Sequence, residues 1–580
     1  MKRGLNYILF LILSLVFYSF FSAPQSFGTG ESFTSISDSS TYNKKYAGLP
    51  REIKYSIGLS PPEYYTLPED NEITKSPYQN INISCDSFPQ NEPSVKISRK
   101  NPDRVVAAWR DFRTGVEPAN RKIGYSYSTD GGNTWQPSTL LLAYNPFYIF
   151  NSDPVVCTDT AGNFYISAIS IDRNKTNSTV LVYKSTDEGV TFDDVYNVTP
   201  HPDSINYGDD KSFMTCDLVN GSPYINTLYA VWSSDSESVL SKSTNGGVNW
   251  SKRINIVPNG GGYALAAAVG PHGELYIVWL GMLNGHKYGL HVSMSTNGGL
   301  NFTTKFICPV ASSLSFTRFP SIAVDVSGGK RTGNIYIVWS NKASSIEDED
   351  VYFSVSSDKG ESWSAPKRVN NDPLNSPRKQ YWPSITVNGY GNIYITFYDT
   401  RNTNSNNTVE AYLARSTNGG NTFQNIPLAN FHTEINYQNT DIRFGDYISI
   451  DSWKNKIIPV WTDERAGGYN MEIYSSVISD STVGITTVSK DIPARFNLYQ
   501  NYPNPFNPAT TIKFDLPMPS FENVTIYNIL GSEVSILVNE KLKEGTHTLN
   551  WDAANYPSGV YLYRVNFGIF IQTGKLLLVK

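Results

Sequence analysis

Short runs of apolar residues, bounded by Gly, Asn and Asp, recur through most of the chain. One set is rich in aromatic and β-branched residues and comprises residues 228–232, 275–279, 335–339 and 393–397. A second set precedes the first in the repeats and includes residues 93–97, 154–157 and 320–324. Runs of this length and composition predict β-strands rather than helices.

An eight-residue segment (octet) of nearly constant sequence occurs six times. The first copy, Ser-Thr-Asp-Gly-Gly-Asn-Thr-Trp, occupies residues 128–135, and the others begin at Ser185, Ser243, Ser295, Ser356 and Ser416. The copies follow one another at intervals of 52 to 61 residues. Repetition at such a period is typical of folds in which each repeat is one supersecondary unit.

The pattern of each repeat predicts three strands, then a turn formed by the octet, and then a fourth strand. Four antiparallel strands per repeat are typical of a propeller blade. Weaker copies of the second strand end at Trp109, Ala168 and Trp461, which brings the number of repeats to seven. We therefore expect an all-β chain with a β-propeller over residues 81–485, of seven blades or, alternatively, six. The seventh repeat lacks the octet, and a strand within residues 81–85 is expected to complete its sheet.

The octet carries features of a tight turn. Gly at its fifth position permits a positive φ, and the Asp or Asn at its third position can accept hydrogen bonds from turn amides. The third-position residues are Asp130, Asp187, Asn245, Asn297, Asp358 and Asn418. Because exchange of Asp for Asn keeps the acceptor and removes the charge, the pattern favours a structural role over acid–base chemistry. The final Trp or Phe is expected to pack between neighbouring sheets.

The octet resembles the Asp box, or BNR repeat, of the sialidase superfamily. This resemblance implies a sialidase-type propeller. Sialidases hold the substrate carboxylate with three arginines and use a Tyr nucleophile assisted by Glu, with an Asp as acid/base. The family's first arginine lies in an Arg-Ile-Pro segment of the first repeat, where this chain has Glu92-Pro93-Ser94. The closest match, Arg318-Phe319-Pro320, lies in the fifth repeat, and local sequence assigns no Tyr–Glu pair.

The pattern changes in the C-terminal part of the chain. Residues 495–580 begin with a Pro-rich segment at 502–508 and continue with short apolar runs to Lys580, which predicts a small β-sandwich. The order and the sequences of these segments resemble those of the type A sorting domain of the type IX secretion system. The resemblance implies export across the outer membrane, with the secretion machinery as a partner and removal of the domain in most cases. An ordinary appended β-domain is the alternative.

The N-terminal residues predict a secretory signal peptide at residues 1–23. Lys2 and Arg3 precede an apolar run at residues 7–21, which is shorter than a membrane span requires. A membrane anchor is the alternative. Residues 24–80 form a polar extension without strand periodicity. We expect a secreted or cell-surface protein with no transmembrane segment after removal of the signal.

Composition narrows the choice of partners. The formal net charge of -5 argues against nucleic-acid binding, which usually requires a basic surface stripe. Four cysteines without CxxC spacing argue against a structural zinc site, and Cys157 and Cys216 are expected to be buried free thiols, although export would permit a disulfide. We expect no cofactor; acidic residues could bind calcium, but no motif specifies a metal site.

Charged residues that could face the central channel precede the first strand or follow the second strand of a repeat, because both loops lie on the face opposite the octets. The candidates are Glu92, Asp111, Arg113, Asp153, Asp210, Arg318, Asp399, Arg401, Arg443, Asp463 and Arg465. Arg side chains at such a site could bind a carboxylated sugar. The alternative is that each Asp-x-Arg pair braces its own loop.

Three functions fit these patterns. The first is an exported sialidase-like propeller that binds a glycan at or near the cell surface. The alternative is an exo-α-sialidase-type glycoside hydrolase that acts on sialylated or related acidic glycans. The third is an adhesive or scaffolding protein. The sequence leaves open whether the protein is an enzyme and names no catalytic residue.

Overall fold

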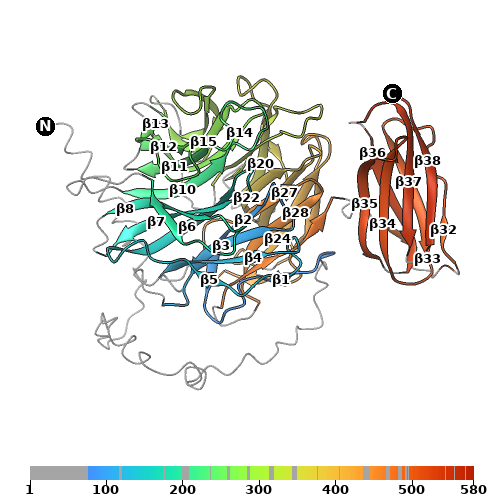
Figure 1. Cartoon of the computed structure of the whole chain (residues 1–580), viewed down its shortest axis with the longest axis horizontal. Helices are drawn as coiled ribbons and strands as arrows, with labels where there is room; N and C mark the ends of the chain where they lie inside the picture. Colours follow the sequence, from blue (N-terminus) through green and yellow to red (C-terminus); the bar gives the residue numbers. More distant parts are fainter. Residues whose placement is uncertain are drawn as a thin grey trace, which may run out of the picture. The chain divides into compact units, whose positions relative to one another are not determined.

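The computed structural model describes residues 76–580, apart from 116–120, 174–176, 199–207, 235–236, 258–260, 284–287, 312–318, 343–348, 375, 404, 436–443, 466–469, 481–485, 490–492, 494, 543, 554–555 and 568–569. The expected signal peptide and nearly all of the expected polar extension therefore lie outside the described residues. Within the described part every regular element is a β-strand (Figure 1). It follows that no described helix is long and apolar enough to cross a membrane.

Seven antiparallel sheets follow one another along residues 81–479, each from one sequence repeat. The first three contain β2 (Gln90–Ile97), β3 (Val105–Asp111), β4 (Lys122–Ser128), β5 (Thr139–Leu140); β6 (Tyr148–Thr158), β7 (Phe164–Asp172), β8 (Ser178–Ser185), β9 (Asp194–Asn197); and β10 (Asp209–Cys216), β11 (Leu228–Ser234), β12 (Glu237–Ser243), β13 (Ile254–Asn255). The fourth and fifth contain β14 (Gly261–Val269), β15 (Leu275–Met282), β16 (Gly289–Ser295), β17 (Thr303–Pro309); and β18 (Ser321–Val324), β19 (Ile335–Lys342), β20 (Glu349–Ser356), β21 (Lys367–Arg368).

The last two of these sheets have an additional short strand. The sixth contains β22 (Gln380–Val387), β23 (Ile393–Asp399), β24 (Thr408–Ser416), β25 (Gln424–Pro427) and β26 (Thr433–Glu434). The seventh contains β27 (Ser449–Trp453), β28 (Lys456–Asp463), β29 (Glu472–Ser475), β30 (Ile478–Ser479) and β1 (Ile81–Asn82). The predicted all-β propeller is confirmed.

The first strands of successive sheets form a closed ring. β2 contacts β6, and contacts continue through β10, β14, β18, β22 and β27, which in turn contacts β2. Figure 1 shows the sheets fanned around a common centre. The first strand of every repeat is therefore the innermost strand, and its residues reach the central channel.

The N-terminal strand completes the seventh sheet. β1 pairs with β29, with Ile81 opposite Ser475, and the Ile83 amide donates to the Ile473 carbonyl at 2.8 Å. The expected closing strand is thus confirmed, although it is shorter than residues 81–85. Because β1 and β29 lie at opposite ends of the propeller sequence, their pairing joins the ends of the ring.

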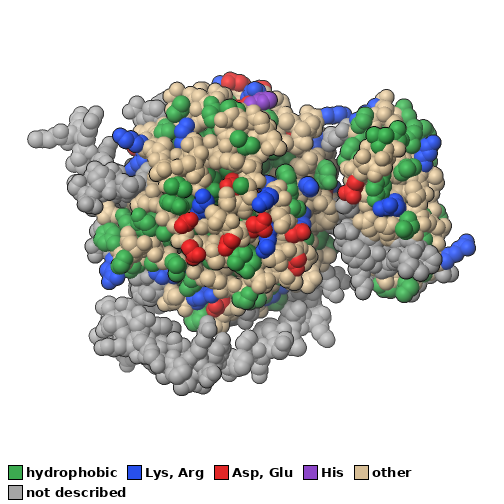
Figure 2. All heavy atoms as spheres, viewed as in Figure 1, with side chains coloured by type: hydrophobic (Ala, Val, Ile, Leu, Met, Phe, Trp, Pro, Cys, Tyr) green, Lys and Arg blue, Asp and Glu red, His purple; other side chains and the backbone are tan. Residues whose placement is uncertain are grey.

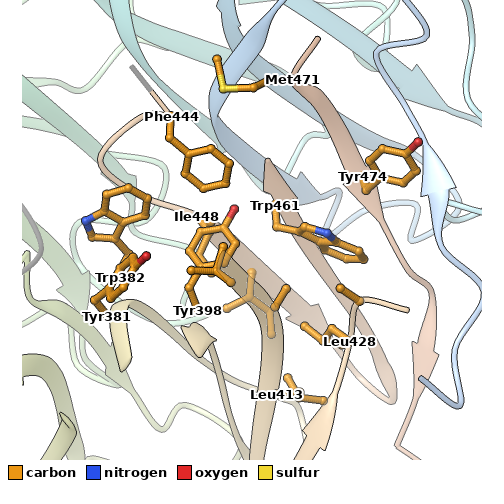
Figure 3. Packing of buried hydrophobic residues seen from close by; sticks show 14 of the residues in the cluster. Tyr381, Trp382, Tyr398, Leu413, Leu428, Phe444, Ile448, Trp461, Met471 and Tyr474 are labelled. Atoms are coloured by element: carbon orange, nitrogen blue, oxygen red, sulfur yellow. The ribbon is translucent and has the colours of Figure 1, made fainter. Parts of the chain in front are cut away.

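Large aromatic side chains fill the space between adjacent sheets. Trp109, Trp232, Trp279, Trp339 and Trp461, all from second strands, are fully buried. Between the sixth and seventh sheets, Trp382 stacks on Phe444 with ring centroids 6.0 Å apart, and Tyr398 meets Phe444 edge-on at 5.4 Å (Figure 3). Burial of each such side chain contributes about 1.5–3 kcal/mol, so the sheets form a rigid frame around the channel.

The octets form the turns between third and fourth strands. In the first, the Asp130 carboxylate accepts hydrogen bonds from the Thr134 amide at 2.9 Å and the Ser128 hydroxyl at 2.8 Å. Asn245 accepts the equivalent amide bond from Asn249 at 2.9 Å. Because a charged and an uncharged side chain accept the same hydrogen bond, both residue types can occupy this position of the turn.

The C-terminal sandwich, which is a separate β-unit, consists of two four-stranded sheets. One contains β31 (Thr486–Ser489), β32 (Asn497–Leu498), β33 (Ala509–Leu516) and β36 (Gly545–Asp552); the other contains β34 (Ser520–Asn528), β35 (Glu533–Leu542), β37 (Gly559–Phe567) and β38 (Phe570–Leu578). Phe506, Phe514, Trp551 and Tyr563 belong to its own hydrophobic core. The predicted β-sandwich at residues 495–580 is present, with β31 as an additional strand that precedes it in the chain.

Candidate functional site

The candidate site is a pocket at the centre of the propeller. Its empty space is about 590 Å³, a volume that includes open solvent at its mouth. All seven repeats line it with residues of the innermost strands or of the segments just before them, among them Pro93, Val155, Lys211, Ala264, Phe319, Trp382 and Tyr447. The propeller ring therefore brings residues from distant parts of the sequence to one place.

A β-bulge near the start of the innermost strand sets which side chains lie at the pocket. The pairing register shifts in β2, β6, β10, β14 and β22. In each shift one residue has a positive φ, namely Glu92 (55°), Asp153 (54°), Lys211 (48°), Ala264 (58°) and Trp382 (53°). A left-handed backbone is unfavourable for such residues, and bulges of this kind re-aim side chains near functional sites. The repeated backbone feature thus presents a different side chain from each sheet.

Glu92 and Arg110 form a buried ion pair in this region. Arg110 Nη2 lies 3.1 Å from Glu92 Oε1, and Arg110 Nε donates to Asn91 Oδ1 at 2.7 Å. Glu92 is 1% exposed, and its Oε2 atom has no hydrogen-bond partner among the described residues. A buried carboxyl oxygen without a donor disfavours the ionised form, in keeping with the raised pKa of this group.

The Lys211 ammonium group lies between a carboxylate and an aromatic ring. Its Nζ atom is 3.8 Å from Asp153 Oδ1 and 3.2 Å from the centroid of the Tyr447 ring. The Tyr447 hydroxyl donates to the Pro154 carbonyl at 3.4 Å, which holds the ring against the second sheet. A cation over the face of an aromatic ring is stabilised by the ring quadrupole.

The carboxyl groups of this cluster have raised pKa values. Burial raises the pKa of Glu92 to about 8; Arg110 opposes this effect, and Asp153 and Asp446 reinforce it. The Asp210 side chain reaches solvent, yet the protein atoms crowded around it displace enough water to raise its pKa to about 7, and Asp153 adds to the shift. Burial and the neighbouring carboxyl groups thus favour the protonated forms of Glu92 and Asp210.

In each Asp-x-Arg pair the arginine binds its own aspartate and a polar side chain of a neighbouring segment. Asp111 accepts from the Trp109 indole at 3.0 Å and from Arg113 Nη2 at 2.7 Å, while Arg113 Nη2 also donates to the Ser138 hydroxyl at 2.8 Å. The other two pairs repeat the Asp–Arg contact, with Arg401 Nη2 2.7 Å from Asp399 and Arg465 Nη2 2.5 Å from Asp463. None of these six residues lines the pocket.

The predicted residues thus fall into three groups. Glu92, Asp153 and Asp210 belong to the charged cluster around Lys211, which lines the pocket, although these three residues do not line it themselves. The three Asp-x-Arg pairs do not line the pocket, and Arg318 and Arg443 lie outside the described residues.

Sequence reasoning missed Arg110, Lys211, Asp446, Tyr447 and Trp382. Trp382-Pro383-Ser384 occupies the same place in its repeat as Glu92-Pro93-Ser94, and that alignment could have identified the bulge position. Lys211 directly follows Asp210, but neither residue type nor spacing indicates that it would meet Tyr447.

The acidic residues do not form a metal centre in the described part of the chain, where no group of three or more His, Cys, Asp or Glu side chains has suitable geometry. Cys157 and Cys216 are buried free thiols, as expected; Cys308 is also buried and free, whereas Cys85 is exposed.

Several solved structures resemble this chain. A protein of unknown function from Dyadobacter fermentans is 16% identical, with 70% of this chain and 98% of that chain covered and a TM-score of 0.41. The leech intramolecular trans-sialidase is 13% identical (55% and 67% covered, TM-score 0.39). The GH93 α-L-arabinofuranosidase of Fusarium graminearum is 13% identical (70% and 98% covered, TM-score 0.39). None of the curated proteins compared with the chain matches its sequence.

Residues 500–580 match the model of the secretion system C-terminal sorting domain. This match confirms the predicted sorting domain, and it indicates export through the type IX secretion system to the cell surface or the extracellular space. The pocket therefore belongs to an exported protein.

Proposed function

We propose that this protein is an exported glycan-binding propeller whose ligand occupies the central pocket. The observation that carries the proposal is the lining of the pocket, in which polar side chains and aromatic rings from different sheets come together. Asp446 supplies an acceptor and Lys211 a donor, and Trp382 and Phe319 supply aromatic faces in the same pocket. Sugar hydroxyls bind to carboxyl groups, and the C–H face of a sugar ring packs on aromatic rings.

The charge of the cluster argues against a sialylated ligand. Among the described residues it contains four carboxyl groups, Glu92, Asp153, Asp210 and Asp446, but two cations, Arg110 and Lys211. Arg110 is already bonded to Glu92 and Asn91. Lys211 likewise lies beside Asp153 and over the Tyr447 ring, so a ligand carboxylate would find no unpaired cation among the described residues of this cluster. We therefore propose a ligand without a carboxylate.

Glycan-array binding of the purified protein tests this proposal. Fluorescently labelled protein is expected to bind a subset of uncharged glycans, and Asp446→Asn, which alters the carboxyl group that lines the pocket, is expected to reduce that binding about tenfold through loss of one hydrogen bond. Asp103→Asn is a matched control, since the Asp103 side chain is 65% exposed in the loop between the first two strands, away from the pocket. Silence across the array would contradict glycan binding and would favour the scaffolding alternative.

A glycoside hydrolase is the second candidate. The specific observation in its favour is the raised pKa of Glu92, about 8, beside Asp153 and Asp446, since glycoside hydrolysis uses a protonated acid and an ionised carboxylate. Release of nitrophenol from a panel of aryl glycosides, with a sialoside and an arabinofuranoside included, tests it. Activity that Glu92→Gln abolishes would support hydrolysis; no release above buffer would exclude it for that panel.

A further inference from the structure

Every innermost strand presents one side chain to the central pocket at the same structural position. Each of these residues pairs with the second-strand residue that directly precedes Trp109 or its counterpart in the other repeats. Four consecutive sheets, the fifth, sixth, seventh and first, place serine there, namely Ser321, Ser384, Ser449 and Ser94. The second, third and fourth sheets place Val155, Phe213 and Ala266 there. The ring of innermost strands is therefore divided into a serine arc and an apolar arc.

The serine arc can donate hydrogen bonds to a ligand. Ser94 Oγ accepts from the Val156 amide of the next sheet at 2.9 Å. Ser321 Oγ accepts in the same way from the Ile385 amide at 3.3 Å, and Ser449 Oγ accepts from an amide of the first sheet at 3.4 Å. A serine hydroxyl has one proton and two lone pairs, so an oxygen that accepts keeps its own proton for another acceptor. Oxygen atoms of a ligand are such acceptors.

The side chains of the apolar arc cannot replace water around a hydroxyl group. Val155 is 6% exposed and Ala266 is 4% exposed, and both belong to hydrophobic clusters of adjacent sheets. A ligand hydroxyl directed at this arc would lose its water without gaining a partner from these side chains, which is unfavourable. A methyl group in the same place would be buried favourably. The arc therefore favours a ligand with an apolar edge.

We propose that the pocket is selective for 6-deoxyhexose residues of a neutral glycan. In such a sugar C6 is a methyl group, and the ring hydroxyls lie along the rest of the ring. The methyl group packs on the apolar arc, and the sugar oxygens accept from the serine arc. On the propeller face in view in Figure 2, acidic and basic side chains are interspersed, which suits a ligand without charge. This inference rests on the proposed glycan binding and names the class of sugar.

Titration of the full chain with matched methyl glycosides, followed by ligand-observed NMR, tests the proposal. The pairs are 6-deoxygalactose with galactose, 6-deoxymannose with mannose and 6-deoxyglucose with glucose, in both the D and the L series. The members of a pair have the same configuration and differ only in the oxygen at C6. In at least one pair the deoxy sugar is expected to bind about tenfold more tightly, because a buried hydroxyl without a partner is unfavourable. Equal or weaker binding of the deoxy sugar in every pair would overturn the inference.

Substitutions in the two arcs are expected to have different effects. Val155→Thr keeps the shape of the side chain but adds a hydroxyl group to the apolar arc, so it is expected to abolish the preference for the deoxy sugar. Val248→Thr is the matched control, because Val248 is 44% exposed in the third octet, and this variant leaves every affinity unchanged. Ser384→Ala removes a donor from the serine arc and is expected to weaken both members of a pair about equally. If Val155→Thr fails to fold by circular dichroism, Ala266→Ser replaces it.

The remaining outcomes separate this inference from the proposed function. A preference that persists in the folded variant of the apolar arc would overturn the inference, since the selectivity would then arise elsewhere. Array signals confined to glycans without a 6-deoxyhexose, or no difference within any pair, would also overturn it and would leave glycan binding intact. No binding of any glycoside, together with an array without signals, would defeat both proposals.

Discussion

Two buried carboxyl groups with raised pKa values serve different purposes at the residue scale. Glu92 lies in the charged cluster around Lys211, whereas Glu472 lies at the closure of the ring, where its carboxyl group accepts from the Ser84 hydroxyl and from the Asp86 amide at 3.3 Å. In both cases burial is the largest cause of the shift. Because the cause is the same, only the surroundings distinguish a site residue from a structural one.

Glu472 predicts a defined pH dependence of stability. Its pKa is about 7 in the folded protein against 4.5 for an unperturbed Glu, so the folded state binds more protons between these values. Its stabilising contribution is therefore complete below pH 4.5 and is lost as the pH rises through 7, by up to about 3 kcal/mol. Glu472→Gln does not titrate, so the variant is expected to gain in stability relative to the wild type from pH 5 to pH 8. Urea unfolding of both proteins at the two pH values measures this gain, and an equal difference at both would refute the assignment.

At the element scale, the same turn and bulge geometries recur from blade to blade while their side chains differ. The Asp-x-Arg turn after the second strand is one such element, since Asp111–Arg113 and Asp463–Arg465 bond in the same way. In both cases the Asp also accepts from the tryptophan two residues before it, at 3.0 and 3.2 Å. The turn therefore ties the end of the second strand to the buried tryptophan.

Removal of the arginine from this turn is expected to affect stability and not binding. In Arg113→Met the fully buried Asp111 carboxylate loses its cation, which is expected to lower the free energy of unfolding by about 3 kcal/mol. Arg564→Met, at an exposed position of the sandwich, serves as the control and is expected to change it by less than about 0.5 kcal/mol. Urea unfolding and glycan titration of both variants provide the measurement. Loss of binding at unchanged stability would instead place Arg113 in the ligand site.

At the scale of the whole molecule, ring closure depends on a few residues before the first repeat. β1 pairs with β29, Ser84 bonds to Glu472, and Arg113 Nε lies 3.5 Å from Asp86 Oδ2. These contacts connect the first sheet to the seventh. Without them the outer edge of β29 would be unpaired.

Two N-terminal truncations test this closure. A chain that begins at Ser76 retains β1 and is expected to melt like the full chain. A chain that begins at Phe88 lacks β1 and its hydrogen bonds, which at about 1 kcal/mol each amount to roughly 3 kcal/mol, and its melting temperature is expected to fall. Thermal unfolding followed by tryptophan fluorescence measures the difference. Equal melting temperatures for the two chains would show that the ring closes without β1.

The repeats and the sorting domain were predictable because their signals are local. Strand length, the octet turn and the Pro-rich segment at 502–508 are properties of neighbouring residues, and they identified the propeller and the sandwich. The site was predicted only in part. Glu92, Asp153 and Asp210 were selected as charged residues before first strands, and the Asp-x-Arg pairs as charged residues after second strands. The arginines of these pairs bind their own aspartates and neighbouring segments and do not line the pocket.

The sequence by itself determined the type of fold and the route of export, since turn chemistry and strand periodicity act over a few residues. Only the tertiary structure decided which charged groups meet. Lys211 and Tyr447 are more than 200 residues apart, yet the ammonium lies 3.2 Å from the ring centroid because the ring brings their first strands to one channel. Burial at that point raises the pKa of Glu92, an effect of surrounding atoms that no local pattern of residues encodes.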